Sequence, residues 1–505
     1  MEYGFHESMP LYAGGLGMLS GDHIKSASDL NIPLVAIGLL YKQGYFKQGI
    51  SKEGDQKIEY FHNDFFRMPL SEMTKNGEKI TIAIDFPGRI VHARVWKAQV
   101  GRTAVYLLDT DIAENSLSDR EITGKLYSGE RHFRIEQEIV LGIGGIRLLE
   151  ELNINPSVYH INEGHSAFLV IERLINLMRY NDLELDTAKE VVKASTIFTT
   201  HTPVPAGIET FEPQLIENYF KHYVEANGLL WKEFWELGRK DVTEKAPYEM
   251  AVLALKHSCK RNGVSRLHGV VSQDMWHDLW KGLLLEEVPI SHITNGVHAA
   301  TWLTVEMKNL LTKYCGIELD EALLQKDIWE KVRVIPDEVL WQAHLVAKNK
   351  LFGYIRERMT ENWIREGENP ELLEEFLRNL SSSPLTIGFA RRCAIYKRPT
   401  LFLKDMDRLK RLILNKRHPV QFVVAGKAHP KDEMAFGLIK EIVRIGKQPD
   451  FLGKIIFLED YDIKLARRMV SGVDVWLNNS RRPLEACGTS GQKAGMNGII
   501  HCSAL

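Results

Sequence analysis

The chain has 505 residues and a formal net charge of −2, and 44% of its residues are hydrophobic and 26% charged. This length exceeds what one hydrophobic core supports, so we expect at least two domains. The balanced charge gives no electrostatic reason to expect nucleic acid or an anionic membrane as a partner, and no apolar run approaches the roughly 20 residues that span a bilayer.

Apolar, β-branched runs alternate with helical patterns through the first half of the chain. The predicted elements of this half are strands over 33–40, 157–161 and 196–200, antiparallel strands within 80–108, and helices over 134–152, 164–181 and 187–195. The second half begins with a charged, helix-rich stretch. Its predicted elements are helices within 336–380 and strands over 384–389, 420–425, 454–458 and 473–477, with helices between those strands.

This alternation predicts an α/β fold, because parallel strands need crossover helices between them. Ligands of such folds bind beyond the carboxyl ends of the strands. Polar side chains stand at or just past five predicted strand ends: Asn162, His201, Arg391, Lys427 and Glu459. We therefore predict two doubly wound domains that face one cleft. The expected divisions are an N-terminal domain over 1–300, a helical connection over 301–380 and a C-terminal domain over 381–505.

A glycine cluster, Gly14-Gly15-Leu16-Gly17, leads into an apparent helix near the beginning of the chain. Backbone N–H groups of such a loop, together with the positive end of the helix dipole, can hold a phosphate. The cluster matches neither the dinucleotide fingerprint nor the Walker A sequence. A tight turn is the alternative interpretation.

A basic run follows the predicted strand at 384–389 and contains Arg391, Arg392, Lys397 and Arg398. An arginine can hold two phosphate oxygens through its planar fork, and a lysine adds a point charge. A phosphate site is therefore one interpretation of the run. A solvated strand end that carries these charges without binding anything is the other.

A third motif, 485–498, places Lys493 among four glycines and beside the hydroxyls of Thr489 and Ser490. Glycines allow backbone N–H groups to approach an oxyanion closely. A lysine in this setting can pair with an anion or condense with an aldehyde once its amine is neutral. A flexible loop with a solvated lysine is the structural alternative.

The five cysteines are scattered, without a CxxC pair or zinc-ligand spacing. Free thiols in a reducing compartment are expected, and no metal site is predicted. The first residues show no secretory signal, so the sequence predicts a cytoplasmic protein.

These motifs resemble those of the α-glucan (glycogen, starch and maltodextrin) phosphorylases of the short prokaryotic type. The resemblance runs along the whole chain and is strongest in the lysine motif at 485–498. Further similar segments are Asn162-Glu163-Gly164-His165, 200–205, 294–298, 425–430 and 457–461, together with 262–268, which is interpreted as structural. The resemblance implies a glycosyltransferase of the GT-B type, with two Rossmann-like domains and an incomplete C-terminal domain.

The resemblance also implies roles for individual residues. Pyridoxal 5′-phosphate would form a Schiff base with Lys493, and inorganic phosphate would bind Arg392 and Lys397. The implied catalytic residues are His201, Arg392, Lys397 and Lys493. The implied cofactor-binding residues are Gly15, Tyr461, Thr489, Ser490, Gly491 and Lys493. The implied substrate-binding residues are Gly14, Leu16, His165, His201, Asn295, Glu485, Ala486 and Gly488.

The implied activity is the reversible phosphorolysis of terminal α-1,4-glucosyl units of a glucan. Inorganic phosphate would accept the glucosyl unit with retention and give glucose 1-phosphate, while the cofactor phosphate donates and accepts a proton. Hydrolases instead use a positioned pair of carboxylates, and no segment of this chain resembles such a pair. A homodimer is a further implication.

The chain departs from the family pattern at a few positions. Ala394 stands where some members carry a histidine, Cys259 where some carry a sugar-contacting histidine, and Gln492 where many carry methionine. Family members also extend beyond both ends, so an internal piece of a longer protein is expected. The rival interpretations are a related transferase that uses a nucleotide sugar, and an inactive fragment that binds glucan or nothing.

Overall fold

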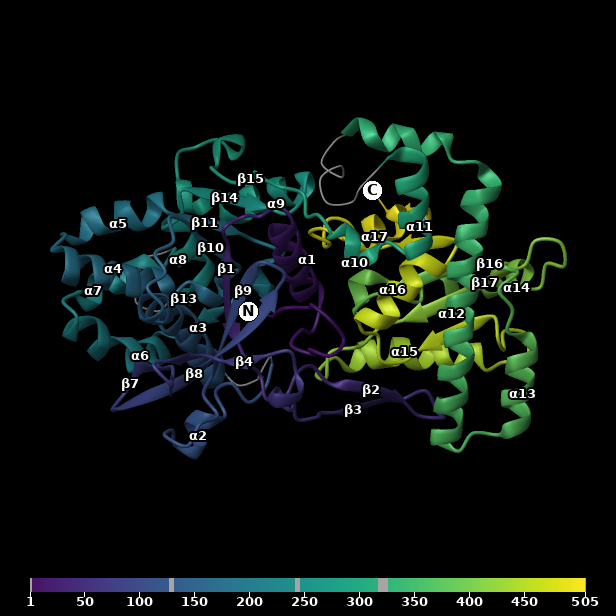
Figure 1. The fold of residues 1–505 in the computed structure, drawn as a ribbon, viewed down its shortest axis with the longest axis horizontal. Coiled ribbons are helices and arrows are strands. Elements are labelled where there is room, and N and C mark those ends of the chain that lie inside the picture. The colour runs from purple at the N-terminus through teal and green to yellow at the C-terminus, as the bar shows by residue number, and fades with distance from the viewer. Residues whose placement is uncertain (1, 127–130, 241–245, 317–325, 505) are drawn as a thin grey trace.

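A computed structural model of the chain describes residues 2–126, 131–240, 246–316 and 326–504. Figure 1 shows the first half of the chain at the left and the second half at the right. Helix α1 (Gly15–Asp29) lies between the two halves, and the long helix α12 (Asp337–Glu366) runs along the right-hand part.

Five strands of the first half form a mixed sheet in the order β1-β9-β8-β4, with β7 also paired to β8. β1 is parallel to β9, whereas β8 is antiparallel to β4, β7 and β9. Exposed and buried residues alternate along β7 because only one of its faces packs on the core. The strands are β1 (Val35–Leu39), β4 (Ser71–Glu72), β7 (Thr81–Phe86), β8 (Arg89–Val100) and β9 (Thr103–Asp109).

Four parallel strands form a second sheet in the order β10-β11-β14-β15, and its apolar residues share one continuous core with the first sheet. The strands are β10 (Tyr159–Asn162), β11 (Thr196–Thr199), β14 (Lys260–Gly263) and β15 (Ser291–His292). The helices of this half are α2 (Leu117–Arg120), α3 (Arg131–Glu151), α4 (Leu169–Asn181), α5 (Leu185–Ala194), α6 (Pro213–Ala226), α7 (Trp231–Leu237), α8 (Met250–Lys256) and α9 (Arg266–Trp276).

Five parallel strands form the sheet of the second half, in the order β18-β17-β16-β19-β20. The chain therefore starts in the middle of this sheet, moves to one edge, and returns past β16 to the other edge. Ligands of such sheets bind where the strand order reverses, which here lies between the carboxyl ends of β16 and β19. The strands are β16 (Leu385–Ala390), β17 (Val420–Ala425), β18 (Ile455–Leu458), β19 (Val475–Asn478) and β20 (Ile500–Ser503).

Helices cover the faces of this third sheet, and buried charges fix α12 to it. Asp474, just before β19, accepts from Nζ of Lys348 at 2.6 Å and lies 2.7 Å from Nε2 of His344, both on α12. Removing Asp474 would leave the buried ammonium group of Lys348 without its counter-charge. The remaining helices are α10 (Ala299–Trp302), α11 (Val305–Leu310), α13 (Pro370–Asn379), α14 (Met406–Ile413), α15 (Glu433–Gly446), α16 (Ile463–Gly472) and α17 (Ser490–Met496).

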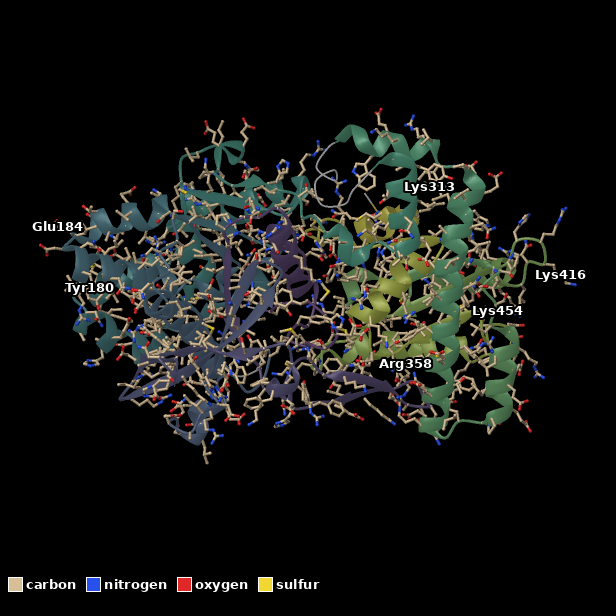
Figure 2. The ribbon with its side chains drawn as sticks, in the orientation of Figure 1. Tyr180, Glu184, Lys313, Arg358, Lys416 and Lys454 are labelled. Atoms are coloured by element: carbon tan, nitrogen blue, oxygen red, sulfur yellow. The ribbon has the colours of Figure 1, made fainter. Side chains whose placement is uncertain are left out.

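The predicted α/β class with parallel sheets is confirmed, and the predicted strands occur with small shifts at their ends. One predicted helix, 164–181, begins instead with a 3₁₀ turn (Gly164–Ser166) before α4 starts. Charged side chains project around the whole periphery, as Glu184 and Lys416 show at opposite ends of the molecule (Figure 2). None of the helices within the described ranges is long and apolar enough to cross a membrane.

A hairpin from the first half reaches onto the sheet of the second half. It consists of β2 (Lys47–Ile50) and β3 (Gln56–Glu59) and runs below α15 in Figure 1. The side chain of Gln48, which is 1% exposed, donates to the carbonyl of Gly426 at 2.9 Å and accepts from the N–H of Asp460 at 2.8 Å. The hairpin therefore holds the loops that follow β17 and β18.

We predict that Gln48→Leu lowers the free energy of unfolding by about 2 kcal/mol. The carbonyl of Gly426 and the N–H of Asp460 would each lose a buried partner, at about 1–3 kcal/mol for an unsatisfied group. Urea unfolding followed by circular dichroism measures the change. Gln214→Leu is the control, because Gln214 is exposed and its amide bonds only Asn218 on the same helix. Equal midpoints for the two variants would contradict the prediction.

Candidate active site

The glycine cluster and the lysine motif, which stand near opposite ends of the sequence, meet in the structure. Gly14 caps α1, and the helix continues through Asp22. Nζ of Lys493, on α17, lies 3.3 Å from Oδ2 of Asp22, and both side chains are buried. The lysine is therefore not solvated, which rules out the flexible-loop interpretation of its motif.

An indole ring completes the surroundings of this amine. Trp302, on α10, has its ring centroid 3.7 Å from Nζ of Lys493, and its Nε1 donates to Oδ1 of Asp22 at 2.7 Å. Asn497 fixes the backbone of Trp302 by donating to its carbonyl at 2.8 Å. Burial lowers the pKa of Lys493, and the negative charge of Asp22 acts in the opposite direction.

Open space adjoins the start of α1. A Cβ atom added to Gly14 or Gly15 would meet no other atom within 4 Å, whereas one on Gly17 would lie 2.7 Å from Cβ of Tyr12. The Tyr12 hydroxyl accepts from the N–H of Ile463 at 3.0 Å, which brings the glycine cluster beside the predicted cofactor segment around Tyr461. Burial raises the pKa of Tyr461, so its phenol stays neutral.

The basic run converges on one carboxylate. Nζ of Lys397 lies 3.0 Å from Oε2 of Glu485, and Nη1 of Arg391 lies 3.4 Å from the same oxygen. Burial lowers the pKa of Lys397 to about 8, although Glu485 acts to raise it. Gly488 allows this approach, because a Cβ atom there would lie 2.7 Å from Nη2 of Arg391.

Arg392, which we predicted to act with Lys397, lies close enough for its charge to lower the pKa of Lys397. Its side chain is exposed and lines a surface hollow together with His429 and Lys431. The buried partner of Lys397 at Glu485 is instead Arg391, a member of the same basic run to which no individual role was assigned. A phosphate role for Arg392 stays a prediction.

Polar groups also gather at the strand ends of the second sheet. Nε2 of His201 lies 3.0 Å from Oδ1 of Asn162, and the His201 N–H donates to the carboxylate of Glu163. Burial, followed by the charges of His268 and His160, lowers the pKa of His201 to about 3, so its imidazole is neutral at ordinary pH.

Glu163 has a strained backbone that no sequence pattern predicts. Its φ of 58° and ψ of −178° define a conformation that non-glycine residues adopt at a cost of about 1–3 kcal/mol. Its carboxylate also accepts from the Thr202 hydroxyl at 2.9 Å. Such strain clusters at functional sites. Two residues further on, His165 is half-buried, and its pKa is lowered, first of all by burial.

Loops of the two halves touch beside the lysine motif. The Gln492 side chain donates to the carbonyl of Asn295 at 2.8 Å, and the Ser265 hydroxyl donates to the carbonyl of Ala486 at 2.6 Å. Gln492 was noted only as a departure from the family, and Ser265 lies in a stretch interpreted as structural. Both side chains instead form hydrogen bonds to loops that carry predicted substrate-binding residues.

Four further predicted residues lie on α1 or at the start of α17. The Ser490 hydroxyl accepts from Nε1 of Trp476 at 3.0 Å, and the Leu16 carbonyl accepts from the Ser20 hydroxyl at 2.8 Å. Thr489 precedes the first residue of α17. A Cβ atom on Gly491 would overlap the ring of His501, so only glycine fits there.

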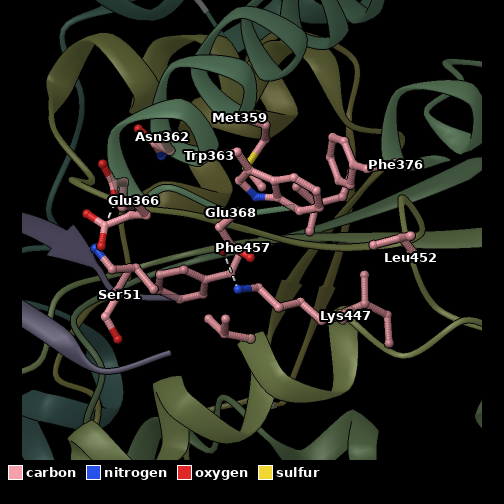
Figure 3. Close-up of a pocket in the computed structure, with 16 residues that line it drawn as sticks. Ser51, Met359, Asn362, Trp363, Glu366, Glu368, Phe376, Lys447, Leu452 and Phe457 are labelled. Carbon is pink, nitrogen blue, oxygen red and sulfur yellow. Dashed lines mark hydrogen bonds and ion pairs between the residues drawn. The ribbon is translucent and has the colours of Figure 1, made fainter. Parts of the chain in front are cut away.

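A separate cavity of about 60 Å³ lies between α12, α13, α15, β18 and the β2–β3 hairpin (Figure 3). Apolar side chains such as Trp363 and Phe376 form one side of it. Its charged groups are already paired, since Lys447 contacts Glu368, and Glu366 contacts Lys57. The cavity is therefore no candidate for the active site.

Known proteins of one family are similar to this chain over most of its length. A family model described as carbohydrate phosphorylase matches residues 147–505. The chain is 46% identical to maltodextrin phosphorylase of Thermococcus litoralis, 41% to glycogen phosphorylase of Mycobacterium tuberculosis and 40% to glycogen phosphorylase of Aquifex aeolicus. Each match covers the whole chain, which spans 59% of the first two relatives and 72% of the third.

The chain therefore belongs to the carbohydrate phosphorylase family. The predicted resemblance to the prokaryotic phosphorylases is confirmed.

We predict that Glu485→Gln lowers the pKa of Lys397 below its present value of about 8, because the carboxylate of Glu485 raises that pKa against burial. Amine labelling over a range of pH, with the Lys397 peptide quantified by mass spectrometry, measures the midpoint. Glu433→Gln, at the exposed start of α15, removes an equal charge and serves as the control. An unchanged Lys397 midpoint in the Glu485 variant would refute the assigned pairing.

Proposed function

We propose that this chain carries the catalytic apparatus of an α-glucan phosphorylase. The reaction is the reversible transfer of a terminal α-1,4-glucosyl unit from glycogen, starch or maltodextrin to inorganic phosphate, giving glucose 1-phosphate. The observation that carries this proposal is the buried amine of Lys493 against the helix that starts at the glycine cluster. The names of the three relatives support the same activity.

We propose two Rossmann-like domains of the GT-B type, 1–300 and 381–505, that face one cleft and are joined by helices over 301–380. The strand order of the third sheet supports this arrangement, because its reversal point lies between β16 and β19. Two hydrogen bonds join the proposed domains. Gln492 donates to the carbonyl of Asn295, and Ser265 donates to the carbonyl of Ala486.

The residues present fit pyridoxal 5′-phosphate. Lys493 offers an amine whose pKa is lowered by burial, which favours the neutral nucleophile that an aldehyde requires. The ring of Trp302 and the open space beside Gly14 and Gly15 suit a planar, phosphate-bearing group. When bound, the cofactor would supply a phosphate that donates and accepts a proton beside the substrate phosphate.

Inorganic phosphate would be held by Lys397 and Arg391, with Arg392 reaching in from the adjacent hollow. Two cations share the single carboxylate of Glu485, so one positive charge remains for an anion. Two neighbouring phosphates would repel each other, and a positive charge beside them offsets this repulsion.

Neutral polar groups would orient the glucosyl unit. His201 is uncharged because burial lowers its pKa. Its neutral imidazole can donate and accept hydrogen bonds with sugar hydroxyls without attracting phosphate. Asn295 and Glu485 lie on the loops that meet at this point, and His165 lies just beyond the strand that ends at Asn162.

Lys493→Ala is predicted to abolish covalent cofactor binding and to lower turnover by at least about a thousandfold, in the range lost when a covalent catalytic group is removed. Absorbance of the bound cofactor before and after borohydride, and phosphate-dependent formation of glucose 1-phosphate from maltooligosaccharide, are the measurements. Lys416→Ala, in an exposed loop, is the control.

Turnover with ADP- or UDP-glucose in place of phosphate would support the nucleotide-sugar transferase instead. Glucan binding without any phosphate-dependent turnover would support the inactive fragment.

The apparent KM for phosphate is predicted to rise as the pH passes above about 8. Burial lowers the pKa of Lys397 to about 8, so the amine is positive below this pH and neutral above it. Lys397→Arg should show a flatter profile, because a guanidinium keeps its charge throughout this range. Initial rates at several phosphate concentrations provide the test. They are measured from about pH 6.5 to about pH 9.5, because this range brackets that pKa. Parallel increases in both proteins would contradict the role of Lys397.

A further inference from the structure

A buried carboxylate faces the amine of Lys493, and none of the predicted roles includes it. Asp22 stands in the middle of α1, is 3% exposed, and has Oδ2 at 3.3 Å from Nζ of Lys493. Within the described part of the chain, that oxygen accepts no hydrogen bond from another group. Its partner oxygen, Oδ1, is fixed by Nε1 of Trp302 at 2.7 Å.

The pair is a compromise between two opposing forces. Transfer of an ammonium group into the protein interior favours the neutral amine, whereas an adjacent carboxylate favours the charged form. The indole face of Trp302, 3.7 Å from the amine, also favours a cation. The carboxylate is thus a group that favours the protonated nitrogen, against the effect of burial.

Other charged groups near the pair are engaged elsewhere. Lys25, one turn further along α1, donates to the carbonyl of Phe5 and to the hydroxyl of Thr301. Arg467, on α16, is paired with Glu7. His501 of β20 is a further titratable neighbour of α17: its ring packs against Gly491, and its pKa is lowered first by burial.

We propose that Asp22 is the counter-ion of Lys493: it takes a proton from the amine when the cofactor aldehyde is attached, and afterwards it keeps the linking nitrogen protonated. This inference rests on the proposed function, because it concerns the cofactor that this function requires. Asp22 acts on the nitrogen of Lys493 and is a positioning residue with respect to the glucan and its phosphate.

The atoms and charges of the attachment balance. The ammonium group of Lys493 gives one proton to Asp22, and the freed electron pair forms a C–N bond to the aldehyde carbon. The aldehyde oxygen then takes one proton from the nitrogen and one from Asp22 and leaves as water. A C=N bond remains, and its nitrogen keeps the third proton beside the restored carboxylate. No oxidant or reductant is involved.

The test is a pH titration of the bound cofactor's absorbance, because the protonated and neutral C=N groups absorb at different wavelengths. Asp22→Asn should move the transition to lower pH by at least about one unit, a tenfold loss of proton affinity. Asp22→Glu retains the charge and should titrate close to the unaltered protein. Asp29→Asn, which removes an equal charge from the end of the same helix, should leave the transition in place.

A second variant and a second measurement keep the proposal testable if Asp22→Asn does not fold or if the protein binds no cofactor. Asp22→Ser removes the same charge with a smaller side chain, and it replaces Asp22→Asn if circular dichroism shows that the latter does not fold. In the cofactor-free protein, labelling of the Lys493 amine as a function of pH should show a lower midpoint in either variant. This second measurement does not need the cofactor.

The outcomes separate the two hypotheses. If the unaltered protein binds no pyridoxal phosphate, the proposed function fails, and the labelling midpoint of Lys493 then decides the role of Asp22. If the charge-removing variants titrate at the same pH as the unaltered protein, in absorbance where cofactor binds or in labelling where it does not, the counter-ion role is overturned.

Discussion

A lysine amine removed from water must either meet a counter-charge or give up its proton, because a low-dielectric interior penalises an isolated ion severely. Lys493 is in this position. Its counter-charge is Asp22, which belongs to a helix from the opposite end of the sequence, and Trp302 contacts both side chains. The contact therefore does two things at once. It fixes α17 against α1, and the carboxylate counteracts the loss of the amine's proton that burial favours.

Buried cations also meet a carboxylate at Lys397 and Arg391, where we propose that phosphate binds. Glu485 lies between Lys397 and Arg391, so its negative charge offsets one of two cations and leaves an excess positive charge. Without Glu485, burial would push the pKa of Lys397 further below about 8 and weaken its charge at neutral pH. The carboxylate therefore maintains the cation that an incoming dianion needs. Gly488 permits this close arrangement, because any side chain there would displace Arg391.

The strands and the α/β class followed from the sequence, because short apolar runs that alternate with helical patterns indicate parallel strands joined by crossover helices. The motifs also indicated which strand ends carry polar groups. The pairing of Asp22 with Lys493 did not follow, since no local pattern links residues so far apart in the chain. Arg391 and Arg392 illustrate a finer limit. Successive residues beyond a strand point to opposite sides, and a run of cations does not reveal which member faces inward. The structure resolves this by burying Arg391 and exposing Arg392.

The backbone geometry of the strand-end loops depends on the other half of the chain. Gly426 has φ of 155° and Asp460 has φ of 56°, and both are bonded to Gln48 on the β2–β3 hairpin. Lys427, between β17 and α15, is likewise held by the carbonyl of Phe46 and by Asp460. These loops precede and follow the segments predicted to surround the cofactor. Their positions are therefore set jointly by both halves, which is why motifs in the second half alone would not define a working site.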